Sequence, residues 1–353
     1  MTTTSLSTRV SRSIELDIAR AIAVIGVVVN HSGVLSLVPE MQEANWELSA
    51  ARLPVICFVI GLFIPGGVAK KGGAHGYIRR RVMFLLWVYV IWFLIQATLE
   101  YFARSRSSPL SIFALWESNQ HLWFLPFVAV GTALVVLLRP WEKRWTLGLL
   151  IALSLATWGW APPYVGADGI ANVAFLALGA ALGKERAVMI LRTRPGSVLA
   201  AGIFAVPAFI ACWLRLDPVP ARDGEIAGIP TALASFLSCL LGILIAFACA
   251  VVLARIPGIG AALAWVGRRT IAVYVAHMAV LSAGANAIGV LNLTSGARDV
   301  ASILVFILGV LVPLALYAAS EHARMRWLFQ PPTSLFNLWP GFRRRDAPGT
   351  DVL

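Results

Sequence analysis

Residues 229–253 read IPTALASFLSCLLGILIAFACAVVL and contain no charged side chain. A helix of this length is longer than the roughly 30 Å of hydrocarbon in a bilayer. Inside hydrocarbon every backbone N–H and C=O must be satisfied by the structure itself, so only helices or closed barrels can span it. Barrel strands alternate apolar and polar residues over about ten positions, and this run does not alternate. It therefore predicts a transmembrane helix.

Runs of this kind recur along the whole chain, separated by short charged or Gly/Pro-rich pieces. Hydrophobic residues make up 59% of the sequence and charged residues only 13%, about half the charged share of a soluble domain. We expect helices near residues 14–37, 53–68, 80–99, 121–138, 145–161, 169–183, 197–214, 229–253, 270–291 and 300–320. The sequence predicts an all-α fold, a polytopic membrane bundle of about ten transmembrane helices.

The distribution of positive charge indicates how the bundle is oriented. A net charge of +12 could suggest a nucleic-acid partner, but the cations lie in clusters between the spans, as membrane orientation requires. Alternate loops hold nearly all of the 29 Lys and Arg residues. The exceptions are Arg52, Arg104, Arg106, Arg215, Arg222 and Arg298. We therefore expect a multi-pass protein of the cell inner membrane with both termini cytoplasmic and no nucleic-acid partner.

The chain is predicted to hold one transmembrane domain over residues 1–329 and a cytoplasmic tail over residues 330–353. The tail is Pro-rich and then basic, which is typical of a segment lying near anionic lipid. Glu15, Asp17 and Arg20 interrupt the place where the apolar core of a signal peptide would begin, so no secretory signal is expected. The four cysteines lie inside apolar spans without metal-ligand spacing, which favours core packing and predicts no metal site.

The first predicted helix, SIELDIARAIAVIGVVVNHSG (13–33), carries ionisable residues along one face. Arg20 and His31 are eleven residues apart, so at about 100° per residue they return to within about 20° of each other, about 16 Å apart along the axis. Asp17 is the i, i+3 neighbour of Arg20. An ionisable residue deep in a membrane is costly unless it faces a partner or a watered cavity. The pattern therefore predicts a functional face.

Each of these residues also has a simpler interpretation when it is considered alone. Arg20 fits an arginine that extends to the inner headgroups, and His31 fits a neutral histidine bonded to a neighbouring helix. Asp17 fits an acid favoured by the positive end of the helix dipole. Independent placement would rarely align Arg20 with His31, so the common face favours a shared role.

The segment ELDIARAIAVIGVVVNH (15–31) resembles the opening helix of the acyltransferase 3 family of membrane O-acyltransferases, in which ten residues separate a basic residue from a histidine. Later blocks resemble the same family in the same order: PVICFVIGLFIPGG (54–67), YIRRRVMFLLWVYVIW (77–92), HLWFL (121–125) and WVGRRTIAVYVAH (265–277). The family usually has Ser-Gly where this chain has Ile60-Gly61.

The resemblance implies a fold of about ten helices and transfer of an acyl group, usually acetyl from cytoplasmic acetyl-CoA. The acceptor is usually a hydroxyl of an extracytoplasmic or lipid-linked glycan, and some members modify small secondary metabolites. Many members carry an extra periplasmic hydrolase-like domain. We expect no such domain here, and we therefore expect the bundle and its outer loops to recognise the acceptor. The expected partners are acyl-CoA, a carbohydrate or lipid-linked acceptor, and membrane lipids.

Acyl transfer from a thioester to a hydroxyl needs a base for the hydroxyl proton, and the ordinary pKa of histidine suits that task near neutral pH. His31 is the candidate, as base or as a transient acyl carrier. Arg20 lies nearer the cytoplasm, where it can bind a donor phosphate or polarise the donor carbonyl, and Asp17 can orient it. We expect Arg20 and His31 to stand on one path across the membrane.

Further candidates come from the other spans. Arg79, Arg80 and Arg81 can bind donor phosphates, or can only set the topology. His277 is a second polar group for the donor, while Tyr274 on the same face fits packing. His121 and Trp123 can bind the acceptor, because aromatic faces suit sugars, although aromatic residues are also ordinary at a membrane interface.

Two other functions remain open. A secondary transporter or lipid-linked glycan exporter would be expected to show repeated halves or carboxylates in mid-membrane, and the sequence shows neither. A non-catalytic membrane partner in polysaccharide assembly would not need Arg20 and His31 on one face. Both alternatives are less favoured than an acyltransferase.

Overall fold

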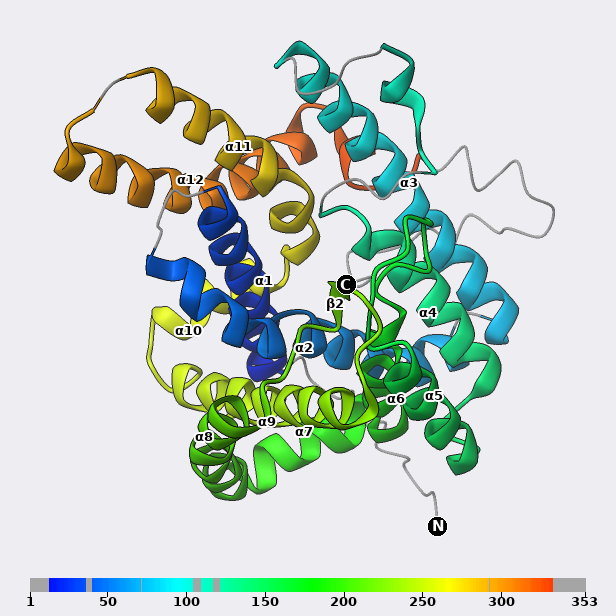
Figure 1. Cartoon of the computed structure of the whole chain (residues 1–353). Coiled ribbons are helices and arrows are strands. Elements are labelled where there is room, and N and C mark those ends of the chain that lie inside the picture. The colour runs from blue at the N-terminus through cyan, green and yellow to red at the C-terminus, as the bar shows by residue number, and fades with distance from the viewer. Residues whose placement is uncertain are drawn as a thin grey trace.

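A computed structural model of the chain describes residues 13–35, 40–70, 72–103, 109–116, 121–291 and 293–332. These residues form twelve α-helices, three short 3-10 helices and two short strands (Figure 1). The α-helices are α1 (Ile14–Val34), α2 (Glu40–Lys70), α3 (Gly73–Phe102), α4 (Phe124–Leu138), α5 (Arg144–Ala156), α6 (Val173–Leu182), α7 (Lys184–Thr193), α8 (Pro195–Leu216), α9 (Ile229–Leu253), α10 (Ile259–Gly267), α11 (Thr270–Val290) and α12 (Ser295–His322). The 3-10 helices are η1 (Pro109–Phe113), η2 (Ile170–Asn172) and η3 (Arg326–Leu328), and the strands are β1 (Gly159–Trp160) and β2 (Arg222–Gly224).

The prediction of a helical membrane protein is confirmed. Six helices of the described residues are long and apolar enough to cross a membrane: α2 from Arg52, α3, α8, α9, α11 and α12. α4, α5 and the segment Ile170–Leu182 are shorter apolar helices. Each of the ten predicted spans overlaps one helix, but the number of crossings and the cytoplasmic location of the termini stay predictions. Most of the predicted tail lies outside the described residues.

Two helices lie where only connecting segments were expected. α7 carries Lys184, Glu185 and Arg186 in its first turn and buries Ala187, Val188 and Leu191, which makes it an amphipathic helix rather than a span. α10 is nine residues long and apolar. Neither helix is long enough to cross a bilayer. A search for apolar runs of that length therefore predicts neither of them.

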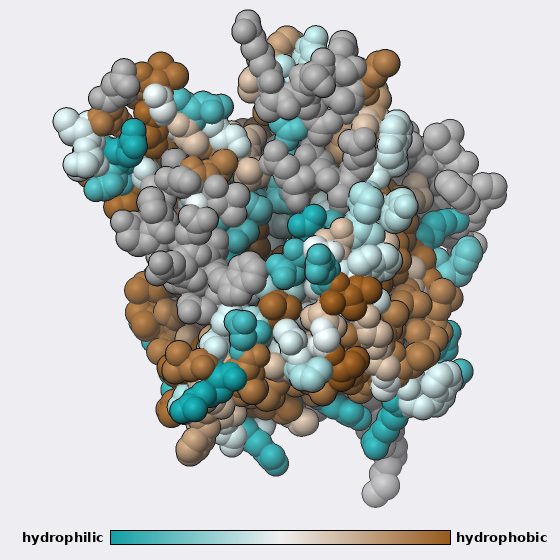
Figure 2. All heavy atoms as spheres, viewed as in Figure 1, coloured by the Kyte–Doolittle hydropathy of each residue, from teal (hydrophilic) through white to brown (hydrophobic). Residues whose placement is uncertain are grey.

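α1 occupies the middle of the bundle, where it packs against α2, α9, α10, α11 and α12 (Figure 1). Its residues Ile18, Ala19, Ala21, Val24 and Val28 are fully buried. The surface is different in kind: α8 and α12 expose large apolar side chains, and apolar patches cover both flanks of the view in Figure 2. In a membrane protein such flanks face lipid, while α1 is shielded from it.

Two glycines set the closest approach between α2 and α6. A Cβ atom on Gly61 would collide with the Leu176 carbonyl, and a Cβ on Gly179 would collide with the Phe58 carbonyl. Small residues let membrane helices pack backbone to backbone in this way. Gly61 belongs to the Ile60-Gly61 pair of the second resembling block, so the glycine of that pair has a packing reason.

Candidate active site

Three histidines from distant parts of the chain meet at the C-terminal end of α1, which is predicted to face outward and is called the outer end below. The ring centroid of His31, on α1, lies 5.7 Å from that of His121 and 5.2 Å from that of His277, on α11. The His121 and His277 centroids are 4.9 Å apart. His121 and His277 are buried, whereas His31 is partly exposed. Each ring is thus in contact with the other two.

Hydrogen bonds fix which nitrogen carries the proton in two of the rings. His277 Nδ1 lies 3.0 Å from the Val273 carbonyl oxygen and 2.8 Å from that of Tyr274. Carbonyl oxygens only accept, so Nδ1 is the N–H and Nε2 is an acceptor. That Nε2 is buried without a hydrogen-bond partner among the described residues. His277 therefore presents a lone pair inside the cluster.

The His121 ring has the same tautomer, fixed by a different contact. The Gln96 side-chain nitrogen donates to the Val275 carbonyl oxygen at 3.0 Å and lies 3.3 Å from His121 Nε2. An amide NH₂ only donates, so Nε2 of His121 accepts and its Nδ1 carries the proton. Tyr274 donates a hydrogen bond to the His121 carbonyl oxygen. Packing was the expected role of Tyr274, and its ring also lies against Phe124 at 5.5 Å.

A cavity of about 380 Å³ opens on this cluster, within the usual size range of small-molecule sites. It is lined by Val27, Asn30, His31, Ser49, Ala50, Arg52, Leu53, Pro54, His121, Trp123, Asn172, Trp213, Pro218, Val219, Pro220, Ala221, Arg222, Ser235, Ser238, Cys239 and Tyr274. His277 is not among these residues. His121 and Trp123, predicted for the acceptor, both reach the cavity.

The segment between α8 and α9 forms one wall of the cavity and is firmly held. β2 pairs with β1 through Gly159 and Arg222. The Trp158 indole nitrogen donates to the Val219 carbonyl oxygen at 3.0 Å, and the Val219 N–H donates to Ser235 Oγ at 2.9 Å. Trp158 and β1 fall inside the span predicted over residues 145–161, but α5 ends at Ala156, so the C-terminal end of that prediction is wrong. β2 lies in a connecting segment that carried no sequence signal.

An ion pair holds the same wall against Trp123. Arg222 Nε lies 2.7 Å from Oδ1 of Asp168, which is fully buried. The Arg222 guanidinium also lies 5.1 Å above the Trp123 ring, and Gly169 packs directly on that indole. From the sequence alone, Arg222 is only one of the cations outside the cytoplasmic clusters. The structure makes it part of the cavity wall.

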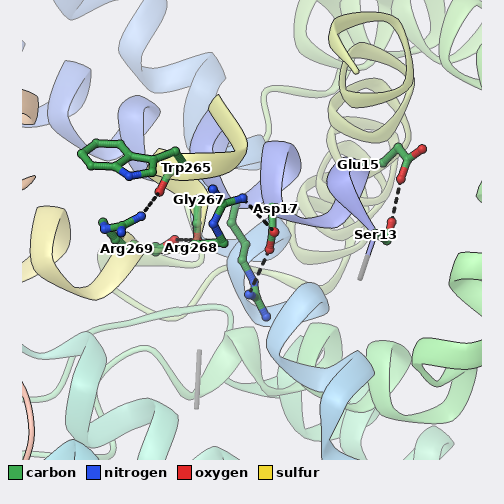
Figure 3. A network of polar contacts seen from close by, with 9 residues as sticks. Ser13, Glu15, Asp17, Trp265, Gly267, Arg268 and Arg269 are labelled. Atoms are coloured by element: carbon green, nitrogen blue, oxygen red, sulfur yellow. Dashed lines mark hydrogen bonds and ion pairs between the residues drawn. The ribbon is translucent and has the colours of Figure 1, made fainter. Parts of the chain in front are cut away.

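A second polar cluster surrounds the N-terminal end of α1, which is predicted to face the cytoplasm and is called the inner end below. Asp17 lies 3.7 Å from the guanidinium of Arg20 and 3.7 Å from that of Arg268. Figure 3 shows Asp17 beside Arg268. Asp17 and Arg20 are buried. The Arg20 guanidinium also lies 4.7 Å from the Phe63 ring centroid, and Lys184 Nζ lies 5.3 Å from the same ring. Three cations from α1, α7 and the end of α10 thus gather around one carboxylate and one aromatic ring.

Gly267 explains why Arg268 reaches Asp17. A Cβ atom at Gly267 would collide with the Asp17 carbonyl group and crowd the Ala21 nitrogen. α10 therefore contacts α1 backbone to backbone, and the next residue along the chain is Arg268. From the sequence alone, Arg268 is only one of the cations that indicate the membrane orientation.

A family model described as an acyltransferase domain, the acyltransferase 3 family, matches residues 13–319. The chain belongs to this family. Searches of curated proteins and of solved structures find no match. The predicted resemblance is confirmed, and the match runs from just before α1 almost to the end of α12, so it includes both clusters of this acyltransferase.

The two clusters of the acyltransferase are not joined by open space. Val24 and Val27 lie on the face of α1 between Arg20 and His31, and both are buried. The cavity reaches Val27 but not Arg20. The expected continuous path from Arg20 to His31 is therefore wrong for this conformation, because apolar side chains fill the interval.

The structure also places the other residues that were predicted to bind the donor. Arg79, Arg80 and Arg81 lie in the first turns of α3, and Arg81 is buried. His277, predicted for the donor, lies instead with His31 and His121. Arg52, which had no predicted role, lines the cavity, and its side chain lies against Gly26 of α1. The chemical roles of all these residues stay predictions.

Proposed function

We propose that this acyltransferase is an O-acetyltransferase of the cell inner membrane, which moves an acetyl group from cytoplasmic acetyl-CoA to a hydroxyl of a glycan, glycolipid or secondary metabolite. The observation that carries the proposal is the position of His31, in the wall of a ligand-sized cavity and in contact with two further histidines. Family membership supplies the class of reaction.

In the proposed reaction the acceptor oxygen attacks the thioester carbonyl carbon while His31 takes the hydroxyl proton. A C–O bond forms, the C–S bond breaks, and the coenzyme A thiolate receives a proton equivalent to the one that His31 accepted. The products are the acetyl ester and coenzyme A thiol. No redox step is needed.

His277 supports this assignment by its fixed tautomer. Because Nε2 of His277 is a hydrogen-bond acceptor inside the cluster, it can accept from an N–H of His31, and the other nitrogen of His31 is then the base. A neighbour that fixes the tautomer of a catalytic histidine is a recurring arrangement. We assign His277 this positioning role in place of donor binding.

The inner cluster is the proposed donor site. Arg20, Arg268 and Lys184 supply cationic donors for the phosphates of acetyl-CoA, and a guanidinium can bind a phosphate through two parallel hydrogen bonds. Asp17 keeps Arg20 and Arg268 together. Arg79, Arg80 and Arg81 on α3 are the further candidates for binding the donor phosphates. Because Val24 and Val27 are packed between the two clusters, the reaction requires this interval to open when the donor binds.

The proposal can be tested in the native host with the full-length variants His31→Ala and Arg20→Ala. Mass spectrometry would follow acetylation of glycans, glycolipids and secreted metabolites. We expect both variants to lose it while still reaching the membrane. His322→Ala is the matched control, because His322 is exposed at the end of α12. Acetylation that survives both changes would show that the proposed site is wrong.

A further inference from the structure

The cavity wall contains three side chains whose polar atoms are buried and unused. Asn172 Oδ1, Trp213 Nε1 and Ser238 Oγ have no hydrogen-bond partner among the described residues. Asn172 and Ser238 are fully buried, and all three residues line the cavity. A buried polar group without a partner loses its hydration and gains no hydrogen bond in return. Three of them around one cavity indicate a surface that is completed by a ligand.

A neighbouring serine shows that such atoms are not a general feature of this wall. Ser235, one helical turn before Ser238 on α9, donates to the Thr231 carbonyl oxygen at 2.7 Å and accepts from the Val219 N–H at 2.9 Å. Its hydroxyl is therefore occupied in holding the cavity wall. Within the described part of the chain Ser238 has neither kind of partner, although both serines reach the same cavity.

The three unused atoms define the chemistry of a complementary ligand. The Asn172 side-chain nitrogen donates to the Gly169 carbonyl oxygen at 3.2 Å, which leaves Oδ1 as an acceptor. Trp213 Nε1 only donates, and a serine hydroxyl does both. None of the three carries a formal charge. Hydroxyl groups, which both donate and accept, satisfy the whole set, whereas a hydrocarbon surface satisfies none of it.

The other tryptophan of the cavity is less available. Trp123 is contacted by the Arg222 guanidinium and by Gly169, so its indole is part of the held wall. Trp213 has an N–H that no described residue accepts. The polar recognition surface is therefore contributed by η2, α8 and α9, while the histidines come from α1, the start of α4 and α11.

We propose that Asn172, Trp213 and Ser238 form a subsite that binds hydroxyls of the acceptor next to the one that reacts. The acceptor is then a polyol unit rather than a simple alcohol, and the subsite selects which hydroxyl faces His31. This proposal rests on the proposed function, because it assumes that the reacting hydroxyl lies at His31.

The test uses purified full-length protein in lipid nanodiscs with radiolabelled acetyl-CoA and two probe acceptors. Methyl α-D-glucopyranoside carries several hydroxyls on a six-membered ring, and cyclohexanol carries one. The variants are Ser238→Ala, Trp213→Phe and Asn172→Leu. Thr132→Val is the matched control, because Thr132 Oγ1 is also buried without a partner among the described residues but does not line the cavity. The melting temperature of each variant checks that it folds.

We expect the native protein to prefer the glucoside, and each subsite variant to lower the ratio of kcat/KM for the glucoside over cyclohexanol by about tenfold, the loss of one good hydrogen bond. NMR of the product should show a single acetylated position in the native protein and several in the variants. Thr132→Val should leave the ratio and the position unchanged.

The other outcomes overturn one proposal or both. If the native protein shows no preference, or if the ratio is unchanged in folded subsite variants, the subsite is wrong and the proposed function stands. The same holds if the protein releases coenzyme A from acetyl-CoA but acetylates neither probe. If it neither transfers acetyl nor releases coenzyme A, the proposed function fails and the subsite fails with it.

Discussion

The two ends of α1 carry polar clusters of opposite character. At the inner end the groups are charged, and Asp17 lies within ion-pair distance of both Arg20 and Arg268. At the outer end His31, His121 and His277 lie together, and two of the rings have a buried nitrogen that no described residue bonds. The cavity opens at the second cluster and does not reach the first. The outer end thus has a cavity beside its histidines, whereas the charged groups of the inner end lie in contact with one another.

The largest expected effect is on kcat, and it distinguishes the roles of the two ends of α1. His31→Ala should lower kcat about 10²–10⁴-fold, the usual contribution of a general base. Binding of coenzyme A, measured by isothermal titration calorimetry, should stay unchanged because His31 lies about 16 Å from Arg20 along the helix. Arg20→Ala should weaken that binding. If His31→Ala weakens coenzyme A binding as much as Arg20→Ala does, the division of α1 into two sites is wrong.

A large effect on stability is expected where α10 touches α1. Gly267→Ala would place a methyl group against the Asp17 carbonyl, and such overpacking costs about 1–3 kcal/mol. The melting temperature of the purified protein should fall, and coenzyme A should bind more weakly because Arg268 moves with α10. Gly148→Ala is the control: Gly148 lies in α5, and a Cβ atom added there would meet no described atom within 4 Å, so the melting temperature should not fall.

His277 provides a smaller effect that distinguishes two roles. If it fixes the tautomer of His31, His277→Ala should lower kcat by about 10–100-fold, within the range for loss of a partner in general acid–base catalysis, and leave KM for acetyl-CoA unchanged. If it binds the donor, as the sequence suggested, KM for acetyl-CoA should rise instead. Steady-state kinetics at saturating acceptor decides between the two.

The sequence allowed some of this arrangement to be predicted, because part of it is local. Arg20 and His31 share a helix, so their common face follows from helical periodicity alone. The contact of His31 with His277 depends on how α1 packs against α11, and no spacing within one helix encodes that. His277 was therefore placed with the donor, although the structure puts its ring 5.2 Å from that of His31.

The same limit explains the missed residues. Arg268 looked like one cation of a topological cluster, because the close approach that brings it to Asp17 is made by a glycine and another helix. Arg222 and Asp168 are far apart in sequence and meet only in the folded outer loops. Asn172, Trp213 and Ser238 carry no distinctive spacing, and polar side chains of this kind also serve ordinary packing between membrane helices. Only the cavity distinguishes them.

The smallest expected effect concerns two adjacent arginines that the sequence cannot tell apart. Arg268 lies 3.7 Å from Asp17, whereas Arg269 donates to the Trp265 carbonyl oxygen at 3.2 Å and stacks 4.3 Å from that tryptophan ring (Figure 3). Arg268→Gln should raise KM for acetyl-CoA a few-fold, because its side chain is partly exposed and solvent screens its charge. Arg269→Gln removes the same charge from the same loop and should leave KM unchanged. Both changes affect membrane orientation equally, so a rise in KM confined to Arg268→Gln ties the donor to the Asp17 cluster. An equal rise of KM for acetyl-CoA in both variants would assign the effect to general surface charge instead. The proposal that the inner end of α1 is a specific donor site would then be wrong.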